Sequence, residues 1–314
     1  MQIIRNINNL PQHLRNSVLA IGNFDGLHLA HQSLLNAAMQ LANAQNKPKI
    51  VMSFHPHPRN YFVKNTANFA IESFALRLKR IQQLGFDCVV INRFNDDLAN
   101  MSAHDFITTI LQRNLGVAHV VVGDDFRFGK NRIGTPKMLR DYGIGCTSFA
   151  PIKLGNEVIS STNIRKNLTN GNTAQVAKLL GRSYEIVGMV VHGEKRGREL
   201  GFRTLNIKLN GLHLPAFGVY AVQLLVGGVV HQAIANIGER PTFSSLGENN
   251  QPNLEVHILA PQPLATTDLY GCKIRVQLLH HVRDEVKFAD ANALQNQIIH
   301  DIEMVNKYFE EHKK

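Results

Sequence analysis

Tryptophan is absent from this chain of 314 residues, and cysteine is scarce: only Cys88, Cys146 and Cys272 occur. The three cysteines lie far apart, without the close spacing of zinc ligands, and an odd number without an export signal indicates reduced thiols. The chain has no apolar run of about 18 residues, so it predicts no transmembrane helix. Its start, MQIIRNINNL, lacks the apolar core of a signal peptide. We therefore expect a cytoplasmic protein without a membrane partner.

Acidic residues are sparse in the first part of the chain. Residues 1–182 carry 21 Lys and Arg against 10 Asp and Glu, a net charge of +11, whereas residues 183–314 carry 13 against 14, a net charge of −1. A basic half is typical of proteins that bind nucleic acid. Here, however, the charges are spread singly and do not alternate with aromatic residues as in a groove on which bases stack. This pattern favours small anionic substrates over nucleic acid.

The hydrophobic pattern changes near residue 182 and predicts two domains. Before it, buried strands alternate with helices, which indicates an α/β domain with a parallel sheet over residues 1–182. After it, short strands follow one another, with a hairpin turn at Gly227-Gly228, so residues 183–314 predict a small six-stranded antiparallel barrel. A helix over residues 290–310 carries an apolar stripe for packing on that barrel. The expected strands are Tyr184–Val191, Asn206–Leu209, Val219–Val226, Val229–Ala235, Leu254–Leu259 and Lys273–Leu279.

A glycine turn near the start of the chain predicts an anion-binding site. The apolar strand Val18–Ile21 leads into Gly22-Asn23-Phe24-Asp25-Gly26, and a helix is expected from His28 to about Asn46. A strand, a glycine turn and a helix N-terminus together present free backbone N–H groups to a phosphate. His28 and His31 fall in the first helical turn, and both can donate hydrogen bonds there. Many α/β proteins with such a unit bind other ligands, and neither a dinucleotide nor a P-loop pattern is present.

Three more segments of the first domain carry polar or rigid residues after a strand or before a helix. Pro56 and Pro58 follow the strand Lys49–Phe54, and Asp125-Phe126 follow the strand His119–Val122. The carboxyl ends of strands are where open α/β sheets place their ligands, although a stiff connector and a solvated loop would have the same composition. Hydroxyl groups before a helix usually act as N-caps. Ser161 and Thr162 together with Arg165 are more than capping requires, and they predict a second anion cradle.

In the second domain, residues 192–202 combine glycines with basic residues. Gly193, Gly197 and Gly201 would let the backbone wrap around phosphates, and Arg198 lies among them. A solvated loop would have a similar composition. This loop runs into Phe202-Arg203-Thr204-Leu205-Asn206, in which Thr204 and Asn206 offer oxygen ligands. Further along, strand alternation places Glu255 and His257 opposite an apolar face.

These segments resemble two enzyme families. G-N-F-D-G-x-H-x-x-H at 22–31 is similar to the histidine signature of nucleotidylyltransferases, in the form found in bacterial FAD synthetases. F-x-P-x-P at 54–58, V-G-D-D-F-R-F-G at 122–129 and I-S-S-T-x-I-R at 159–165 resemble further segments of that family. In the second domain G-F-x-T-x-N at 201–206, A-N-I-G-x-R-P-T at 235–242 and L-E-V-H at 254–257 resemble riboflavin kinases. The chain departs from these patterns at Ala30, Arg203 and Leu205, where Gly, Pro and Ala are usual.

The resemblance implies a bifunctional bacterial riboflavin kinase/FAD synthetase. Its Rossmann-like nucleotidyltransferase domain, residues 1–182, would adenylylate FMN to FAD, and its kinase domain, residues 183–314, would phosphorylate riboflavin with Mg²⁺ and ATP. Riboflavin, FMN and FAD would be substrates and products of a monomer or weak homo-oligomer. In the first domain the resemblance implies charge-stabilising roles for His28, His31 and Arg165, and contacts to ATP and FMN from Gly22, Asn23, Phe24, Asp25, Gly26, Pro56, Pro58, Asp125, Phe126, Ser161 and Thr162.

For the kinase, the resemblance implies that Glu255 is the general base and that Thr204 and Asn206 are ligands of Mg²⁺. It assigns ATP and riboflavin binding to Gly193, Gly197, Arg198, Gly201, Phe202, Thr204, Asn206, Arg283 and Glu285. Two alternatives remain open from the residues alone. One is an adenylyltransferase for another phosphorylated acceptor, with a barrel that only binds it. The other is a basic nucleic-acid-binding protein without enzymatic activity.

Overall fold

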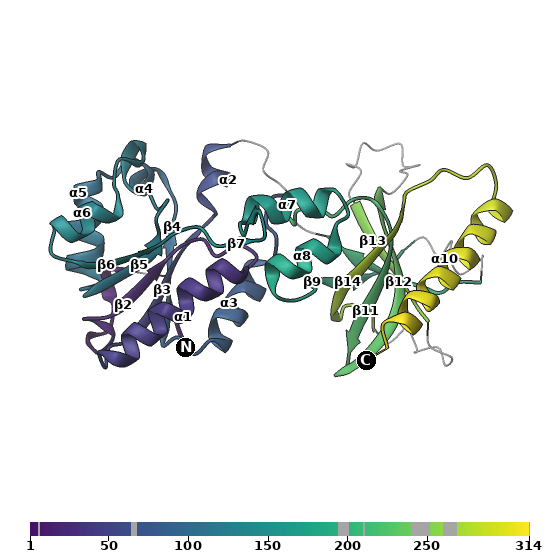
Figure 1. The fold of residues 1–314 in the computed structure, drawn as a ribbon, viewed down its shortest axis with the longest axis horizontal. Helices are drawn as coiled ribbons and strands as arrows, with labels where there is room; N and C mark the ends of the chain where they lie inside the picture. The colour runs from purple at the N-terminus through teal and green to yellow at the C-terminus, as the bar shows by residue number, and fades with distance from the viewer. Residues whose placement is uncertain are drawn as a thin grey trace. The chain divides into compact units, whose positions relative to one another are not determined.

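The structure is a computed structural model, and it describes residues 1–5, 7–63, 68–193, 201–209, 211–239, 252–259 and 269–313 (Figure 1). The chain divides into two compact units. The first unit comprises Met1–Ala67 and Phe74–Ser161, and the second comprises Asn68–Ser73 and Thr162–Lys314. These two units are groups of residues in mutual contact. The expected boundary at residue 182 separates the residues that each activity needs, and it stays a prediction. Among the described residues, no helix is long and apolar enough to cross a membrane.

The first unit is built on a parallel six-stranded sheet in the order β1-β4-β3-β2-β5-β6. The apolar runs found in the sequence form its central strands, because a parallel sheet covered on both faces buries consecutive residues. The edge strand β1 was not predicted, since its three residues are too few to show a pattern. The strands are β1 (Gln2–Ile4), β2 (Val18–Ile21), β3 (Lys49–His55), β4 (Cys88–Arg93), β5 (His119–Gly123) and β6 (Gly145–Phe149).

Helices cover both faces of this sheet, and alternate strand residues define two cores. Val18 and Ala20 pack with α1 (Leu29–Ala44) and α3 (Phe74–Gln83), whereas Leu19 and Ile21 pack on the other face. That other face is covered by α5 (Ala103–Asp105), the π-helix η3 (Phe106–Asn114) and α6 (Pro136–Asp141). The remaining elements are η1 (Ile7–Asn9), η2 (Gln12–Leu14), α2 (Pro58–Phe62), α4 (Asp96–Asn100), η4 (Lys130–Arg132) and the hairpin β7 (Lys153–Leu154) with β8 (Glu157–Val158).

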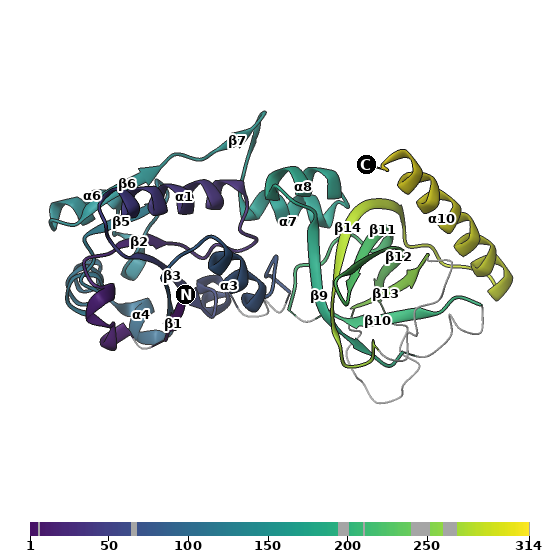
Figure 2. The same ribbon diagram turned by 90° about the horizontal axis from the view of Figure 1, so that it is seen from below.

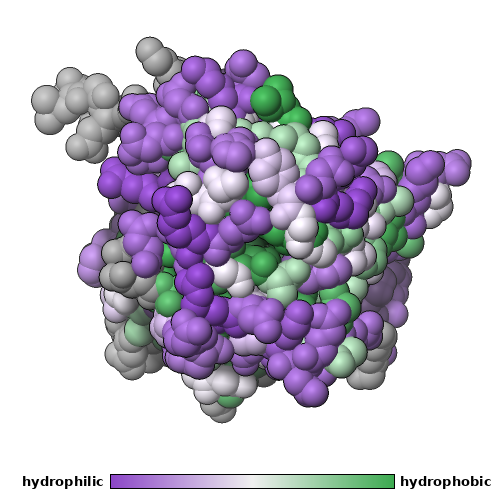
Figure 3. All heavy atoms as spheres, turned by 90° about the vertical axis from the view of Figure 1, so that its left-hand side faces the viewer, coloured by the Kyte–Doolittle hydropathy of each residue, from purple (hydrophilic) through white to green (hydrophobic). Residues whose placement is uncertain are grey.

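Local sequence signals set several helix ends in this unit. The Ser102 hydroxyl accepts from the Asp105 N–H and donates to the Asp105 carboxylate, so Ser102 is the N-cap of α5. The helix that follows continues as a π-helix, which has no simple sequence signature. On the face of the unit that Figure 3 shows, hydrophilic residues predominate and hydrophobic residues emerge singly or in small groups. This distribution is ordinary for a surface that faces water.

The second unit contains a closed barrel with the strand order β10-β13-β12-β11-β14-β9, and every pairing is antiparallel. The hairpin turn at Gly227-Gly228 has φ values of 56° and 86°, which suit the type I′ turn that glycine favours. The strands are β9 (Tyr184–Val191), β10 (Thr204–Lys208), β11 (Gly218–Val226), β12 (Val229–Glu239), β13 (Pro252–Ile258) and β14 (Lys273–Asp284). An α/β unit with a parallel sheet and a six-stranded barrel confirm the predicted fold class.

Among the described residues, the helices that belong mainly to the second unit are α7 (Ser161–Thr169), α8 (Thr173–Leu180) and the terminal α10 (Ala291–Glu311). Figure 2 shows α10 running along the outside of the barrel strands. Its Val305 and Phe309 are buried against Val219, Ala221 and Ile234, so the predicted apolar stripe packs on the barrel as expected. The outward-facing residues of β11 and β12 are therefore apolar where α10 covers them.

Candidate active sites

The histidine turn joins β2 to α1, at the carboxyl end of a central strand. The helix begins at Leu29, so His28 is its N-cap and not a residue of its first turn. The His28 Nδ1 accepts a hydrogen bond of 3.3 Å from the His31 N–H. An accepting Nδ1 leaves the proton of the neutral ring on Nε2, which is thereby a donor. The predicted position within the first turn is therefore wrong by one residue, and capping fixes the tautomer of the neutral His28 ring.

His31 stacks on His28, with ring centroids 3.5 Å apart, and meets the edge of Phe24 at 5.3 Å. Within the described residues, its Nδ1 is buried without a hydrogen-bond partner. Burial, followed by the nearby His28 and Arg77, lowers the pKa of His31 well below 6.5. The ring is therefore neutral at pH 7. A phosphate beside it would accept a hydrogen bond from a ring N–H.

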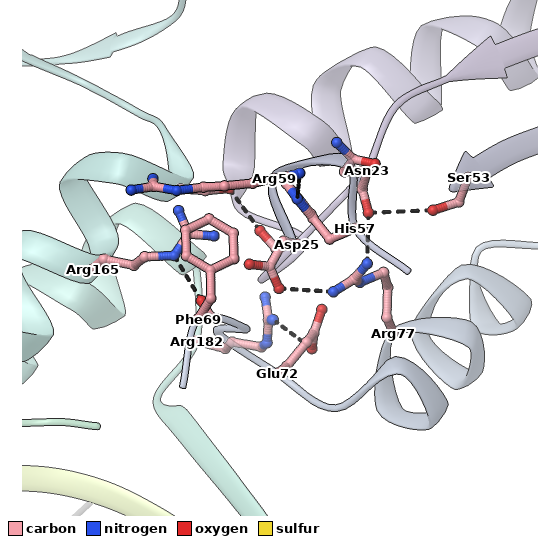
Figure 4. Close-up of polar contacts among 11 residues, drawn as sticks. Asn23, Asp25, Ser53, His57, Arg59, Phe69, Glu72, Arg77, Arg165 and Arg182 are labelled. Carbon is pink, nitrogen blue, oxygen red and sulfur yellow. Dashed lines mark hydrogen bonds and ion pairs between the residues drawn. The ribbon is translucent and has the colours of Figure 1, made fainter. Parts of the chain in front are cut away.

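A buried ion pair holds the glycine turn (Figure 4). Arg77 of α3 donates from Nη2 to Asp25 Oδ1 at 2.8 Å and from Nη1 to the Asn23 carbonyl at 2.9 Å. The Ser161 hydroxyl donates to the Asp25 carbonyl at 2.9 Å. Phe24, in the middle of the turn, has a φ of 52°, a strained conformation for a residue with a side chain. These contacts fix a backbone geometry that the turn would not adopt by itself.

Two other predicted loops lie at the same edge of the sheet. Strands β3 and β5 both pair with β2, so the segments after all three strands emerge side by side. Pro56 follows β3, and Pro58 begins α2, whose N-cap is His57. Asp125, which follows β5, is exposed, and Phe126 stacks on Phe128 at 5.5 Å. The structure thus brings together the expected proline loop, the acidic loop and the histidine turn.

Arg165 and Thr162 lie on α7, in the part that belongs to the second unit. Thr162 is exposed, and the Arg165 guanidinium stacks on the Phe69 ring at 3.6 Å (Figure 4). Its Nε also donates to the Phe69 carbonyl at 2.9 Å. Ser161 is not the N-cap expected from its place before the helix, because α7 already includes it and its hydroxyl donates to the Asp25 carbonyl. Stacking and the bond from Nε hold the plane of the guanidinium against Phe69.

The barrel carries a second polar cluster on its outer face. In register, Glu255 of β13 lies between Asn206 of β10 and Asn236 of β12. Neighbouring Leu205 and Val256 are buried inside the barrel, so alternation turns these polar side chains outward. Thr204 shares the face of Asn206, two residues earlier. Residues that are far apart in the sequence but carry side-chain oxygen atoms therefore lie together on the adjacent strands β10, β13 and β12.

Two glycines let polar side chains of this cluster approach the backbone closely. A Cβ atom on Gly193 would collide with the Asn206 amide, and one on Gly238 would collide with the Glu285 carboxylate. Mg²⁺ binds through a few protein oxygens and completes its shell with water and phosphate oxygens. The hydroxyl of Thr204 and the amide oxygen of Asn206 are ligands of this kind, and Gly193 lets the Asn206 amide lie where a larger residue would displace it. The residues present therefore fit a magnesium–nucleotide complex.

The remaining predicted residues differ in their surroundings. Gly201 has a φ of 88°, which glycine adopts readily, and the Phe202 ring meets His257 edge-on at 5.6 Å. Arg283 makes a two-pronged ion pair with the buried Asp301 of α10, with contacts of 2.7 to 3.1 Å. Its guanidinium also lies 5.8 Å from the Phe288 ring. Gly197, Arg198 and residues 240–242 of the A-N-I-G-x-R-P-T segment lie outside the described residues.

Comparison with known proteins covers both units. A family model described as FAD synthetase matches residues 10–163, and one described as riboflavin kinase matches residues 180–309. The chain is 38% identical to the bifunctional riboflavin kinase/FMN adenylyltransferase of Buchnera aphidicola from Acyrthosiphon pisum, over 100% of both chains. Identity to the protein of that name from Escherichia coli K12 is 37% over 98% of both chains. The chain belongs to the bifunctional riboflavin kinase/FMN adenylyltransferase family.

The fold agrees with a solved structure along its whole length. The crystal structure of a macrolide-efflux protein from Streptococcus pneumoniae has a TM-score of 0.85, covers 97% of this chain and 98% of its own, and is 29% identical. Bacillus subtilis provides a further bifunctional riboflavin kinase/FMN adenylyltransferase, 35% identical over 97% of this chain. The family resemblance stated from the sequence motifs is thereby confirmed.

Two residues that contact this family's motifs escaped sequence analysis. Arg77 holds the turn of the histidine signature, and Asn253 contacts both Asn206 and Glu255. Nothing in the basic helix around Arg77 distinguishes it from its neighbours Lys79 and Arg80. For Asn253 a signal was present, because it alternates with Glu255 and His257 on the polar face of β13.

Proposed function

We propose that this chain is a bifunctional enzyme of flavin cofactor synthesis. Residues 183–314 would phosphorylate riboflavin to FMN with ATP, and residues 1–182 would join FMN to AMP from a second ATP, giving FAD and pyrophosphate. The observation that carries the proposal is that each family's motif residues form a separate cluster. His28 and His31 stack at one helix N-terminus, whereas Asn206 and Glu255 face each other across barrel strands. Full-length similarity to bifunctional relatives supports it.

In the kinase reaction, the 5′-hydroxyl oxygen of riboflavin forms a bond to the γ-phosphorus of ATP as the bond to ADP breaks. Glu255 accepts the hydroxyl proton as that bond forms. Thr204 and Asn206 would hold Mg²⁺, which neutralises phosphate charge when it is bound. ATP phosphates would be enclosed by the glycine-containing loop. Its proposed contacts are Gly193, Gly197, Arg198, Gly201 and Phe202, with Glu285 and Arg283 beside riboflavin.

In the adenylyl transfer, a phosphate oxygen of FMN attacks the α-phosphorus of ATP, and the bond to pyrophosphate breaks. The acceptor is already an anion, so no base is required. His28 Nε2, His31, Ser161, Thr162 and Arg165 would stabilise the charge that moves onto the leaving phosphates. Backbone groups of residues 22–26 would surround the phosphates, while Pro56, Pro58, Asp125 and Phe126 would line the nucleotide and flavin at the edge of the sheet.

The test separates the two activities in one protein. His28→Ala should abolish FAD formation and retain FMN formation, and Glu255→Ala should abolish FMN formation and retain FAD formation from supplied FMN. Products of riboflavin and Mg-ATP are resolved by chromatography. A single change that silences both reactions in a folded protein would contradict two independent sites. An enzyme that forms neither FMN nor FAD, but adenylylates another phosphorylated acceptor, would establish the alternative enzyme.

The proposed setting follows from the same chemistry. We propose a cytoplasmic enzyme with reduced thiols that uses small-molecule substrates and has neither a nucleic acid nor a membrane as its partner. A monomer or weak homo-oligomer is expected, and light scattering across a range of protein concentrations measures this. Retention on nucleic acid that salt abolishes, without riboflavin-dependent ATP turnover, would favour the non-enzymatic alternative.

A further inference from the structure

The buried side-chain amide of Asn253 contacts both Asn206 and Glu255 of the proposed kinase site. Asn253 lies on β13, two residues before Glu255, and its side chain faces the same way. It is only 6% exposed, although it is polar and on the outer face of the barrel. Burial of a polar side chain is costly unless its hydrogen bonds are made, so the hydrogen-bond partners of this amide indicate its role.

The amide nitrogen of Asn253 donates to oxygen atoms of two residues of the proposed kinase site. Nδ2 donates to Asn206 Oδ1 at 2.7 Å and to Glu255 Oε1 at 3.2 Å. Among the described residues, these are the hydrogen bonds made by the Asn253 side chain. One donor nitrogen therefore links the proposed metal ligand on β10 to the proposed base on β13.

The bond to Asn206 has a chemical consequence. A carboxamide has an oxygen end with lone pairs and a nitrogen end without them, and only the oxygen can ligate Mg²⁺. Because Asn253 donates to Asn206 Oδ1, it fixes which end of that amide lies in the cluster. The oxygen retains a second lone pair for a metal ion. The neighbouring strand position, Gly238, has no side chain that could replace this donor.

We propose that Asn253 is a positioning residue of the kinase site, which orients the Asn206 oxygen for Mg²⁺ and sets the Glu255 carboxylate beside it. This inference rests on the proposed kinase function. Groups that orient metal ligands from outside the coordination shell typically change metal affinity or activity by about 10- to 100-fold when they are removed. The same range is expected here, because a single donor serves two groups.

The experiment uses the full-length chain and three variants. Asn253→Leu keeps the number and branching of the side-chain heavy atoms and removes the donor, while Asn253→Asp keeps the shape and replaces the donor by a negative charge next to Glu255. Gln232→Leu, an exposed position on β12, makes the same kind of change away from the cluster. The measurements are kinase kcat and KM for Mg-ATP, binding of Mn²⁺ with ADP by electron paramagnetic resonance, and FAD formation from supplied FMN.

Asn253→Leu should lower kinase kcat/KM and weaken Mn²⁺ binding, each by about 10- to 100-fold, and leave FAD formation within about twofold. Asn253→Asp should lose more kinase activity, and Gln232→Leu should match the unchanged chain. Kinase activity and Mn²⁺ binding within about twofold of the unchanged chain in Asn253→Leu would overturn the inference and leave the proposed function standing. Unfolding of the barrel by both Asn253 variants would also overturn it, since the role would then be in folding. If the unchanged chain makes no FMN, the proposed function itself fails.

Discussion

The ion pair between Arg77 and Asp25 offers a direct measure of how burial changes the value of a charge. Its nitrogen and oxygen are 2.8 Å apart, and the side chains are 5% and 2% exposed. The first unit contains a matched pair at the surface, Lys137 and Asp141, which are 2.9 Å apart with 77% and 51% exposure. Removing the cation from each pair compares the loss of stability at nearly equal distances, once in a buried and once in an exposed setting.

The expected magnitudes differ severalfold. At an effective dielectric constant of about 20, charges at the buried separation attract by about 6 kcal/mol, and in bulk water by about 1.5 kcal/mol. Much of the buried attraction is offset by desolvation. Removing one partner nevertheless costs about 3–5 kcal/mol, because the other charge stays buried alone. Arg77→Met should therefore lower the unfolding free energy of the first unit by that amount, and Lys137→Met by less than about 1 kcal/mol.

Hydrogen exchange with peptide resolution is the suitable assay. The chain lacks tryptophan, so no indole signal reports on unfolding, and a chain of two units does not unfold in a single two-state step. Peptides from β2 and α1 measure the first unit, and peptides from the barrel provide an internal reference. The double variant Asp25→Asn/Arg77→Met should recover part of the loss. Equal small effects at both sites, or strictly additive effects in the double variant, would refute this reasoning.

Three further outcomes are expected. Folding holds the pKa of His31 well below 6.5, so as pH falls the unfolded chain protonates this histidine before the folded chain does. The contribution of neutral His31 to stability is therefore complete above pH 6.5 and is lost as pH falls toward the pKa in the folded state. Exchange measured from pH 7 to 5 should show this loss, and His31→Gln should reduce it. Burial raises the pKa of Cys88 to about 11, so a disulfide reagent should label the exposed Cys272 first and Cys88 only through opening. Asp301→Asn weakens the ion pair with Arg283. It should lower the free energy of opening of α10 by about 1.5–3 kcal/mol and so speed hydrogen exchange there.

Much of the fold was readable from the sequence because local patterns determine it. The central strands are apolar runs, and the barrel strands carry period-two alternation between turn residues. Tyr184–Val191 was predicted to the residue. The three residues of β1 were missed because a strand this short has no period of its own, and it is placed by pairing with β4. The expected first turn at His28 was displaced by one residue because an imidazole took the capping position usually held by Ser, Thr, Asp or Asn.

The candidate sites divide in the same way. Motif residues could be found from the sequence, but the partners that hold them lie far along the chain. Arg77 is 52 residues from Asp25, and Asn253 is 47 residues from Asn206. A buried arginine and an exposed one have the same letter, and only packing distinguishes them. Pairings at such separations depend on which helix covers which turn and on strand register, neither of which a single sequence specifies.

Departures from the family patterns can be judged once side-chain direction is known. Leu205, where Ala is usual, is buried inside the barrel and lies on the opposite face of β10 from Thr204 and Asn206. Its larger side chain therefore belongs to the barrel core. Arg203, where Pro is usual, is exposed, and its carbonyl accepts from His257 Nδ1 at 2.9 Å, a contact that any residue type could make. The riboflavin kinase pattern is thus kept at the two strand positions that face the polar cluster, and it varies where side chains point elsewhere.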